Sequence, residues 1–274
     1  MQSIAGWQIG RCADMKDNYR RREAVKPVEE VEGQLEGRNA LTEALRSGRT
    51  IDKVFIASGE TDKGLQRLAA QAKEAGAVVV PVDRRKLDAM SATRAHQGVI
   101  ALAAARDYFS IDDILQEAAD RGEAPLIVIC DELSDPHNLG AILRSAECAG
   151  AHGVIIPKRR SVGLTAVVAK ASAGAVEYMK VARVTNINAA MEELKEKGVW
   201  IFGTAAEGSI PMYQTDLTGP TAIVIGSEGD GMSRLVRQNC DVTVHIPMKG
   251  KITSLNASAA ASILLYEAVR QRLG

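Results

Sequence analysis

The chain has 274 residues, of which 46% are hydrophobic and only 4% aromatic, so we expect an aliphatic core shared by one large or two modest domains. Lys and Arg together number 34, as do Asp and Glu, and this zero net charge gives no indication of a nucleic-acid partner. No apolar run is long enough to span a bilayer, and the N-terminus lacks the long apolar core of a signal peptide. These absences predict a cytoplasmic protein with no membrane partner.

The four cysteines lie far apart in the sequence, at Cys12, Cys130, Cys148 and Cys240, and form no CxxC pair. Such spacing indicates neither a disulfide framework nor a zinc site. We therefore expect small, buried thiols in a reducing compartment.

Residues 1–32 are polar and irregular, and we interpret them as an N-terminal extension. A solvated tail without a role is favoured over an RNA-contacting tail. Residues 33–106 show helix and strand patterns in alternation, which predicts a small α/β domain. Its helices are expected at 39–46, 63–75 and 84–90, and its strands at 53–57, 78–82 and 98–104.

Basic residues gather late in this small domain, at Arg84, Arg85, Lys86, Arg94 and Arg106. Taken alone, such a group is a solvated surface. It becomes a phosphate-contacting face only if the second domain acts on RNA, because phosphate affinity depends on local positive charge.

Residues 107–124 form an acidic linker with one predicted helix at 111–119, and a second domain is expected over 125–274. In that domain strands alternate with helices, which predicts a parallel sheet covered on both faces. The expected strands are 126–130, 154–156, 181–184, 199–203, 222–225 and 242–246, and the expected helices are 138–149, 164–172, 187–197 and 257–272.

Two of these strands end in glycine-rich or polar loops, GSEGDG at 226–231 and PMKGKITSLN at 247–256. In open α/β sheets ligands bind at the carboxyl ends of the strands, where small residues allow close approach. The alternative is an ordinary turn. Neither loop is a GxxxxGK[ST] or a GxGxxG motif, so nucleotide triphosphates and dinucleotides are disfavoured.

Polar side chains also follow the first strand of this domain, at Asp131, Glu132, Asp135 and His137. A polar turn that caps a helix explains them more simply than a metal site, so we expect no metal. In the helix that follows, Arg144 by itself looks like a surface arginine. No serine nucleophile elbow or reactive cysteine setting supports a hydrolase.

Three stretches taken together resemble one family, the SpoU/TrmH RNA ribose 2′-O-methyltransferases. They are DPHNLGAILRSAECAGAHGVIIP at 135–157, IVIGSEGDGM at 223–232 and HIPMKGKITSLNASAAASILLYE at 245–267. Residues 125–274 resemble the bacterial branch that methylates guanosine in 23S ribosomal RNA. Residues 33–106, with EGRNALTEAL at 36–45, resemble its small RNA-binding domain less specifically.

The resemblance implies an α/β fold with a deep trefoil knot near the C-terminus, a homodimer, and S-adenosylmethionine bound in the knot. Cofactor contacts are implied at Thr204, Gly226, Ile246 and Leu255. The residues of the reaction are implied to be Asn138, Arg144, Glu228, Ser254 and Asn256. One departure is Ala257, where relatives often have valine; it should only loosen the packing.

Proposals for the family give the general-base role to Arg144, but an arginine is effectively always protonated. Arg144 can instead hold the target phosphate or stabilise the developing alkoxide, with an RNA phosphate as the base. The expected substrate is a guanosine of 23S ribosomal RNA, and the alternative is a transfer RNA guanosine. An inactive RNA-binding member of the fold and a nucleotide-binding enzyme of another class are the remaining hypotheses.

Overall fold

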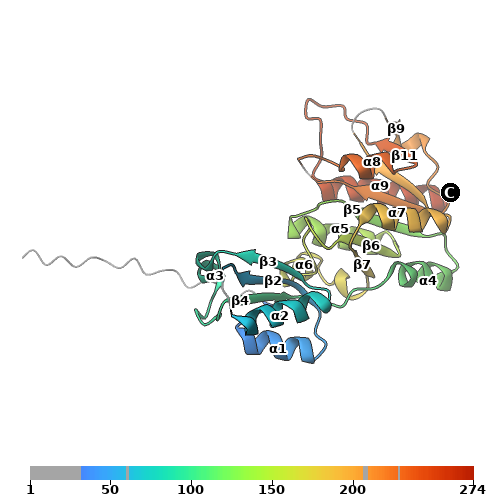
Figure 1. The fold of residues 1–274 in the computed structure, drawn as a ribbon. Coiled ribbons are helices and arrows are strands. Elements are labelled where there is room, and N and C mark those ends of the chain that lie inside the picture. The colour runs from blue at the N-terminus through green and yellow to red at the C-terminus, as the bar shows by residue number, and fades with distance from the viewer. Residues whose placement is uncertain (1–31, 60–61, 206–208, 228) are drawn as a thin grey trace, which may run out of the picture.

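The computed structural model describes residues 32–59, 62–205, 209–227 and 229–274, so the predicted extension lies outside the described residues except for its last residue. The described chain forms two sheets, one of four strands and one of seven. The smaller sheet comes first in the sequence and lies beside one edge of the larger (Figure 1). No helix in the described ranges is long and apolar enough to cross a membrane.

The small sheet has the strand order β1-β4-β2-β3, with β2 and β3 parallel and the other pairs antiparallel. The strands are β1 (Gln34–Glu36), β2 (Ile51–Ala57), β3 (Val78–Val82) and β4 (Val99–Ala103). The helices are α1 (Arg38–Arg46), α2 (Lys63–Glu74) and α3 (Arg84–Met90). Leu41 of α1 and Leu65 and Leu68 of α2 pack on the sheet in one buried cluster, because they recur at helical spacing. All of these elements except β1 lie where the sequence predicts them.

The acidic segment between the sheets contains α4 (Ile111–Arg121). Its ends have clear local causes: Ser110 and Asp113 form a capping box, and Gly122 adopts the left-handed conformation at the C-terminal end. Ile111 and Ile114 of this helix are buried against the large sheet. The segment is therefore packed on the large domain.

The large sheet is parallel throughout, in the order β7-β6-β5-β10-β8-β11-β9. Its strands are β5 (Leu126–Cys130), β6 (Gly153–Pro157), β7 (Val181–Val184), β8 (Trp200–Thr204), β9 (Ile210–Pro211), β10 (Thr221–Ile225) and β11 (Val242–His245). Its helices are α5 (Pro136–Cys148), α6 (Ala166–Ala171), α7 (Ile187–Glu196), α8 (Arg234–Gln238) and α9 (Ala257–Leu273), with short 3-10 turns at Ala175–Glu177 and Met212–Gln214.

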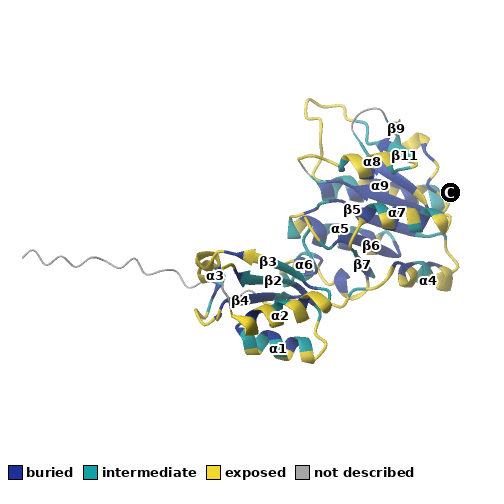
Figure 2. Cartoon of the chain, in the orientation of Figure 1, coloured by how far each residue is buried: buried dark blue, intermediate teal, exposed yellow. Residues whose placement is uncertain are grey.

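Helices cover both faces of this sheet, as predicted. Leu139 of α5, Val168 of α6 and Leu264 of α9 belong to one buried cluster. Ile114 of α4 and Met191 of α7 belong to the other. The central strands are consequently dark blue along their whole length in Figure 2. Such strands read as continuous apolar runs in the sequence, which is why they were predictable.

The prediction of buried thiols is confirmed for Cys130 and wrong for Cys148, which is exposed at the C-terminal end of α5. Cys240 is partly buried, and Cys12 lies outside the described residues. Cys148 lies two residues beyond Ala146, the last buried residue of α5, and at that position of the helix its side chain faces solvent. The strand β9 and the helix α8 were not predicted, because both are very short.

Candidate active site

Four strands of the large sheet end side by side. β10 pairs with β5 on one side and β8 on the other, and β8 pairs with β11. Since all four are parallel, their carboxyl ends lie at one edge, where a ligand can meet several loops at once. The loops after β10 and β11 are the two glycine-rich or polar loops of the sequence.

Two adjoining cavities open at this edge, of about 390 and about 590 Å³. Thr204, Ser254 and Leu255 line both of them. Gly226 lines the smaller cavity and Ile246 the larger. The four predicted cofactor residues are therefore brought together around one continuous hollow, whose parts are within the usual range for small-molecule sites.

The loop after β10 is folded back on itself. The backbone N–H groups of Ser227 and Gly231 each donate to the other's carbonyl at 3.0 Å. A Cβ on Gly226 would lie 2.2 Å from the backbone of Gly231 and Met232, so any larger residue would push the loop open. Gly226 thus allows the backbone of the loop to form part of the cavity wall.

The starts of α5 and α9 meet beside this hollow. Asn256 caps α9 by accepting from the backbone N–H of Ser258 at 3.0 Å. Its Nδ2 donates to Oδ1 of Asn138 at 2.9 Å. Asn138 is 5% exposed, and its own Nδ2 has no hydrogen-bond partner among the described residues. The site therefore contains a buried amide donor without a described partner, although Asn138 and Asn256 themselves line neither cavity.

Three of the four polar side chains that follow β5 interact within the protein. Asp131 accepts from the backbone N–H of Ser233 at 2.7 Å, which ties this turn to the loop before α8. Glu132 pairs with Arg160 at 2.9 Å, and Asp135 caps α5. Among the described residues no three His, Cys, Asp or Glu side chains are placed to hold a metal ion.

The remaining predicted residues are placed less closely. Arg144 is exposed on α5 and is not among the residues that line the two cavities. Its neighbour Ser145 is joined to Ser262 of α9 by a hydrogen bond of 2.7 Å, so Arg144 is one residue away from the contact between these helices. Glu228 lies outside the described residues.

Sequence reasoning missed three ionisable residues at the cavities. Asp230 and Arg237 line the smaller one, and His245 lines the larger, where its Nδ1 is 3.0 Å from Oγ of Ser209. His245 begins the third motif and Asp230 lies inside the second, so membership of a motif could have identified both residues. Arg237 is on α8, which has no strong sequence signal of its own.

A parallel α/β domain with ligand-sized cavities at its carboxyl edge, attached to a second α/β domain, defines a two-domain enzyme class that acts on a substrate held beside a small cofactor. A family model described as the SpoU rRNA Methylase family matches residues 125–266. A second, described as RNA 2′-O ribose methyltransferase substrate binding, matches residues 34–109.

Individual proteins agree with these matches. A Bacillus subtilis (strain 168) protein assigned to the TrmH family of tRNA/rRNA methyltransferases is 49% identical over 236 residues, which cover 86% of this chain and 94% of that protein. The AviRb SpoU methyltransferase of Streptomyces viridochromogenes, solved with AdoMet, is 27% identical with a TM-score of 0.57, covering 88% of this chain and 90% of that one. An AdoMet-bound rRNA methyltransferase of Sinorhizobium meliloti is 25% identical with a TM-score of 0.56, covering 88% of each chain.

The chain belongs to the SpoU rRNA methylase family. The predicted family and the predicted class of enzyme, an RNA methyltransferase, are confirmed.

Proposed function

We propose that this protein transfers the methyl group of S-adenosylmethionine to a ribose 2′-hydroxyl of a guanosine in 23S ribosomal RNA. The carrying observation is that Thr204, Gly226, Ile246 and Leu255, drawn from three separate segments, line two adjoining cavities at the carboxyl edge of the sheet. A guanosine of transfer RNA is the alternative substrate, since the Bacillus subtilis relative is named for both kinds of RNA.

The hollow fits the chemistry of this cofactor. Ile225, Met232 and Leu255 supply apolar walls for an adenosine ring, and the backbone of the loop after β10 supplies polar groups for its edges. We propose that Thr204, Gly226, Ile246 and Leu255 make these contacts. When bound, S-adenosylmethionine supplies a methyl group on a positively charged sulfur, so that the transfer needs no metal.

The chain's own residues orient the acceptor. The methyl carbon must lie in line with the 2′-oxygen, and such alignment in a dry site accounts for much of the rate of group transfer. We assign the unpaired Nδ2 of Asn138 to the ribose or its phosphate, and Asn256 to holding Asn138 in place. Ser254, on the wall of both cavities, bonds the ribose or a loop carbonyl.

Arg144 and Glu228 complete the proposed set. Arg144 holds the phosphate of the target nucleotide and stabilises the developing alkoxide, while an oxygen of that phosphate accepts the hydroxyl proton. Glu228 orients Arg144 or Asn138 through a charge-assisted hydrogen bond. The bond from carbon to sulfur breaks as the bond from carbon to the 2′-oxygen forms, and the electron pair stays on sulfur.

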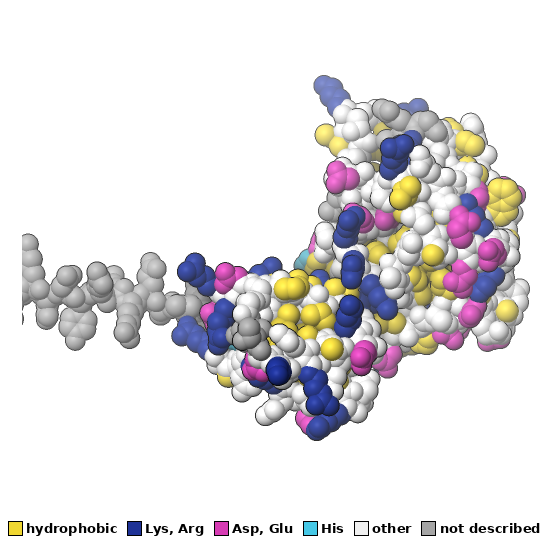
Figure 3. All heavy atoms as spheres, in the orientation of Figure 1, with side chains coloured by type: hydrophobic (Ala, Val, Ile, Leu, Met, Phe, Trp, Pro, Cys, Tyr) yellow, Lys and Arg dark blue, Asp and Glu magenta, His cyan; other side chains and the backbone are white. Residues whose placement is uncertain are grey.

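RNA contacts both domains in this proposal, and residues 34–109 match a substrate-binding family model. We divide the chain into an extension at 1–32, an RNA-binding domain at 33–106, a linker at 107–124 and a methyltransferase domain at 125–274. Figure 3 shows Lys and Arg side chains along one face, from the tip of the large domain down to the junction with the small one. A cavity of about 940 Å³ at the junction is lined by residues of both domains, including Arg49 and Lys170.

We also propose a cytoplasmic homodimer with a trefoil knot. The segment between β11 and α9 shares a cavity wall with the loop after β10, which suits a chain that threads there. α9, which contacts α5 through Ser262, exposes Ile263 and Tyr266, and a second copy would cover these apolar side chains. The mass of the protein in solution, measured by light scattering, tests the proposed dimer. We expect twice the mass of one chain.

Mapping 2′-O-methyl groups in ribosomal and transfer RNA from a strain that lacks the gene tests the proposed substrate. We expect one guanosine of 23S ribosomal RNA to lose its methyl group. Loss from a transfer RNA instead would select the alternative. Calorimetry with S-adenosylmethionine, ATP and NAD separates this function from another nucleotide-binding class, because only the first should bind.

A further inference from the structure

A buried ion pair joins the two domains. Nη1 of Arg183, on the edge strand β7 of the large sheet, lies 2.7 Å from Oδ1 of Asp52, on β2 of the small sheet. The two side chains are only 7% and 6% exposed. Asp52 is the extra residue of a β-bulge, because Ile51 and Lys53 pair with consecutive residues of β4. A bulge redirects a side chain, and here it turns Asp52 to the neighbouring domain.

Several segments of the chain converge on this carboxylate. Tyr108 donates its O–H to Asp52 at 2.8 Å and accepts from the backbone N–H of Leu164 at 2.9 Å. Nη2 of Arg183 donates to the backbone carbonyl of Asp52 at 3.0 Å. A Cβ on Gly163 would lie 2.2 Å from Oδ2 of Asp52, so the domains approach this closely only because Gly163 has no side chain.

Stability alone does not explain this contact. Burial raises the pKa of the Asp52 carboxyl, while Arg183 and the Tyr108 O–H act to lower it. Oδ2 of Asp52 and Nε of Arg183 are buried without a hydrogen-bond partner among the described residues. Apolar residues at such a place are often neutral or stabilising. Unlike apolar contacts, the hydrogen bonds of this ion pair form at only one relative orientation of the two sheets. The ion pair can therefore fix that orientation.

The orientation matters for a substrate that touches both domains. Nη2 of Arg183 also reaches the carbonyl of Lys158, at 3.5 Å, and Lys158 directly follows the carboxyl end of β6. The Nζ of Lys158 lies 3.9 Å from where a Cβ of Gly76 would be, just before β3. The junction thus fixes the small domain at the same sheet edge that holds the cofactor cavities.

We propose that Asp52 and Arg183 are positioning residues for methyl transfer: they fix the small domain so that RNA held by both domains delivers one ribose to the cofactor cavities. This proposal rests on the proposed function. It differs from a packing role because it predicts an effect on RNA that is separate from folding and from cofactor binding.

The test compares two variants with a matched control. Asp52→Asn removes one charge with little change of shape, and the double variant Asp52→Leu/Arg183→Met replaces the pair with apolar side chains. Glu177→Gln removes the carboxylate from the Arg106–Glu177 ion pair, which crosses the same junction but is about half exposed, and leaves the charge of Arg106 in place. For wild type and variants one measures thermal unfolding, S-adenosylmethionine affinity, and KM and kcat with deproteinised 23S ribosomal RNA lacking the modification.

We expect the double variant to fold and to bind S-adenosylmethionine as wild type does. Its kcat/KM for RNA should fall about tenfold or more, because small misplacements of the ribose cost catalysis heavily. Small-angle scattering should show a wider range of domain separations. Glu177→Gln should stay within about twofold, because exposed ion pairs contribute little.

An unchanged kcat/KM and scattering profile in the folded double variant would overturn the proposal, and so would a loss equalled by Glu177→Gln. If Asp52→Asn alone fails to fold, the double variant still decides. If the wild-type protein itself does not methylate RNA, the proposed function fails, while scattering still reports whether the pair fixes the two domains.

Discussion

Nδ2 of Asn256 donates to Oδ1 of Asn138 across 2.9 Å, which ties the first turn of α9 to the first turn of α5 over 118 residues of sequence. Because this bond uses the carbonyl side of Asn138, its amide Nδ2 is left as a buried donor without a partner in the described structure. An unsatisfied buried donor costs about 1–3 kcal/mol, so a bound molecule that accepts from it is favoured. The relationship is the most specific local support for a substrate contact at Asn138.

Two substitutions at Asn256 separate its roles. Asn256→Asp retains an oxygen that caps α9 but cannot donate, so Asn138 turns its Nδ2 to the new carboxylate and loses it for substrate. We expect stability within ~0.5 kcal/mol of wild type, since Asp and Asn are similar caps, together with a large loss of methyl transfer.

Asn256→Ala should lose activity and also about 1 kcal/mol of unfolding free energy. Denaturant unfolding and initial rates measure both quantities. Full activity in Asn256→Asp would contradict a substrate contact by Nδ2 of Asn138.

Arg144→Ala should abolish methyl transfer and leave S-adenosylmethionine binding nearly intact, because Arg144 is outside the cavity walls. Single-turnover rates and calorimetry measure the two effects. The control is Arg121→Ala, an exposed arginine of α4 on the acidic linker, which we expect to be neutral. Retention of more than about a tenth of the wild-type rate, a loss of under ~1.4 kcal/mol, would contradict the role assigned to Arg144.

RNA affinity should fall steeply with added salt although the net charge is zero, because a local patch sets how many counterions are released. There are two candidate clusters. Arg84, Arg85 and Lys86 on α3 are exposed at the far end of β3 from Gly76, the residue that Lys158 approaches. Lys158, Arg159 and Arg160 follow β6. Arg160 of the second cluster is paired with Glu132, and Arg106 is paired with Glu177.

Neutralising Arg84, Arg85 and Lys86 together should flatten the salt slope of RNA binding by up to ~3 units, one for each phosphate contact, without changing cofactor affinity. The same change at Lys158, Arg159 and Arg160 is the matched comparison. Binding to deproteinised 23S ribosomal RNA at several salt concentrations measures the slope. If it is unchanged in the α3 variant, α3 is not part of the RNA surface.

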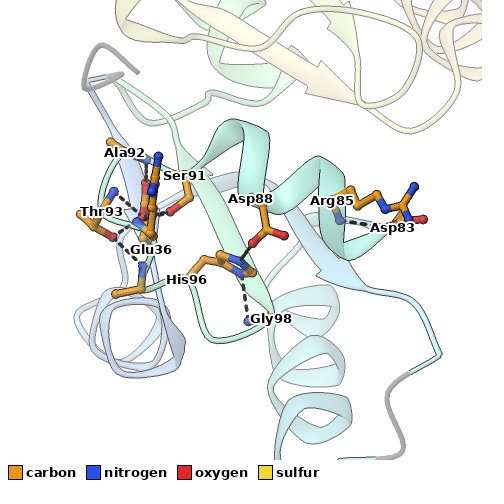
Figure 4. Close-up of polar contacts among 11 residues, drawn as sticks. Glu36, Asp83, Arg85, Asp88, Ser91, Ala92, Thr93, His96 and Gly98 are labelled. Carbon is orange, nitrogen blue, oxygen red and sulfur yellow. Dashed lines mark hydrogen bonds and ion pairs between the residues drawn. The ribbon is translucent and has the colours of Figure 1, made fainter. Parts of the chain in front are cut away.

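Glu36 should make the stability of the small domain depend on acid pH. Burial raises its pKa, but hydrogen bonds from Ser91, Thr93 and the backbone of Ala92 outweigh this and lower the pKa from 4.5 to about 2 (Figure 4). A carboxyl whose pKa is lower in the folded state stabilises fully above its unfolded pKa. Its contribution is therefore lost as pH falls from about 4.5 to about 2.

Unfolding measured between pH 7 and pH 2 tests this for wild type and Glu36→Gln. The variant should be less stable at pH 7, and the difference should shrink in that acid window. Glu43→Gln, an exposed glutamate of α1 paired with Arg46, is the control and should show little difference at any pH. A constant difference between wild type and Glu36→Gln across the window would contradict the assignment.

The sequence allowed prediction of those elements whose patterns are local. The buried strands β5 and β10 are continuous apolar runs, and α4 begins with a capping box and ends at a glycine. β1 was missed because its three residues, QLE, carry no apolar alternation, and α8 because five residues are too few to show a period. The functional assignment came from three motifs together, since each glycine-rich loop alone is an ordinary turn.

Long-range contacts between charged residues were beyond sequence reasoning. Asp52 and Arg183 are 131 positions apart, and each alone looks like a surface charge. Their burial follows from a β-bulge in one sheet, an edge strand in the other and the missing side chain of Gly163. None of these three features is visible as a pattern in the sequence.

The proposed methylation of RNA is tested most directly with the purified protein, methyl-labelled S-adenosylmethionine and unmodified 23S ribosomal RNA. After incubation the RNA is digested to nucleosides, and the labelled product is identified by mass spectrometry. We expect 2′-O-methylguanosine from a single position, and we expect this product to be absent with Arg144→Ala. Label on a base atom, or no label from a protein that binds the cofactor, would contradict it.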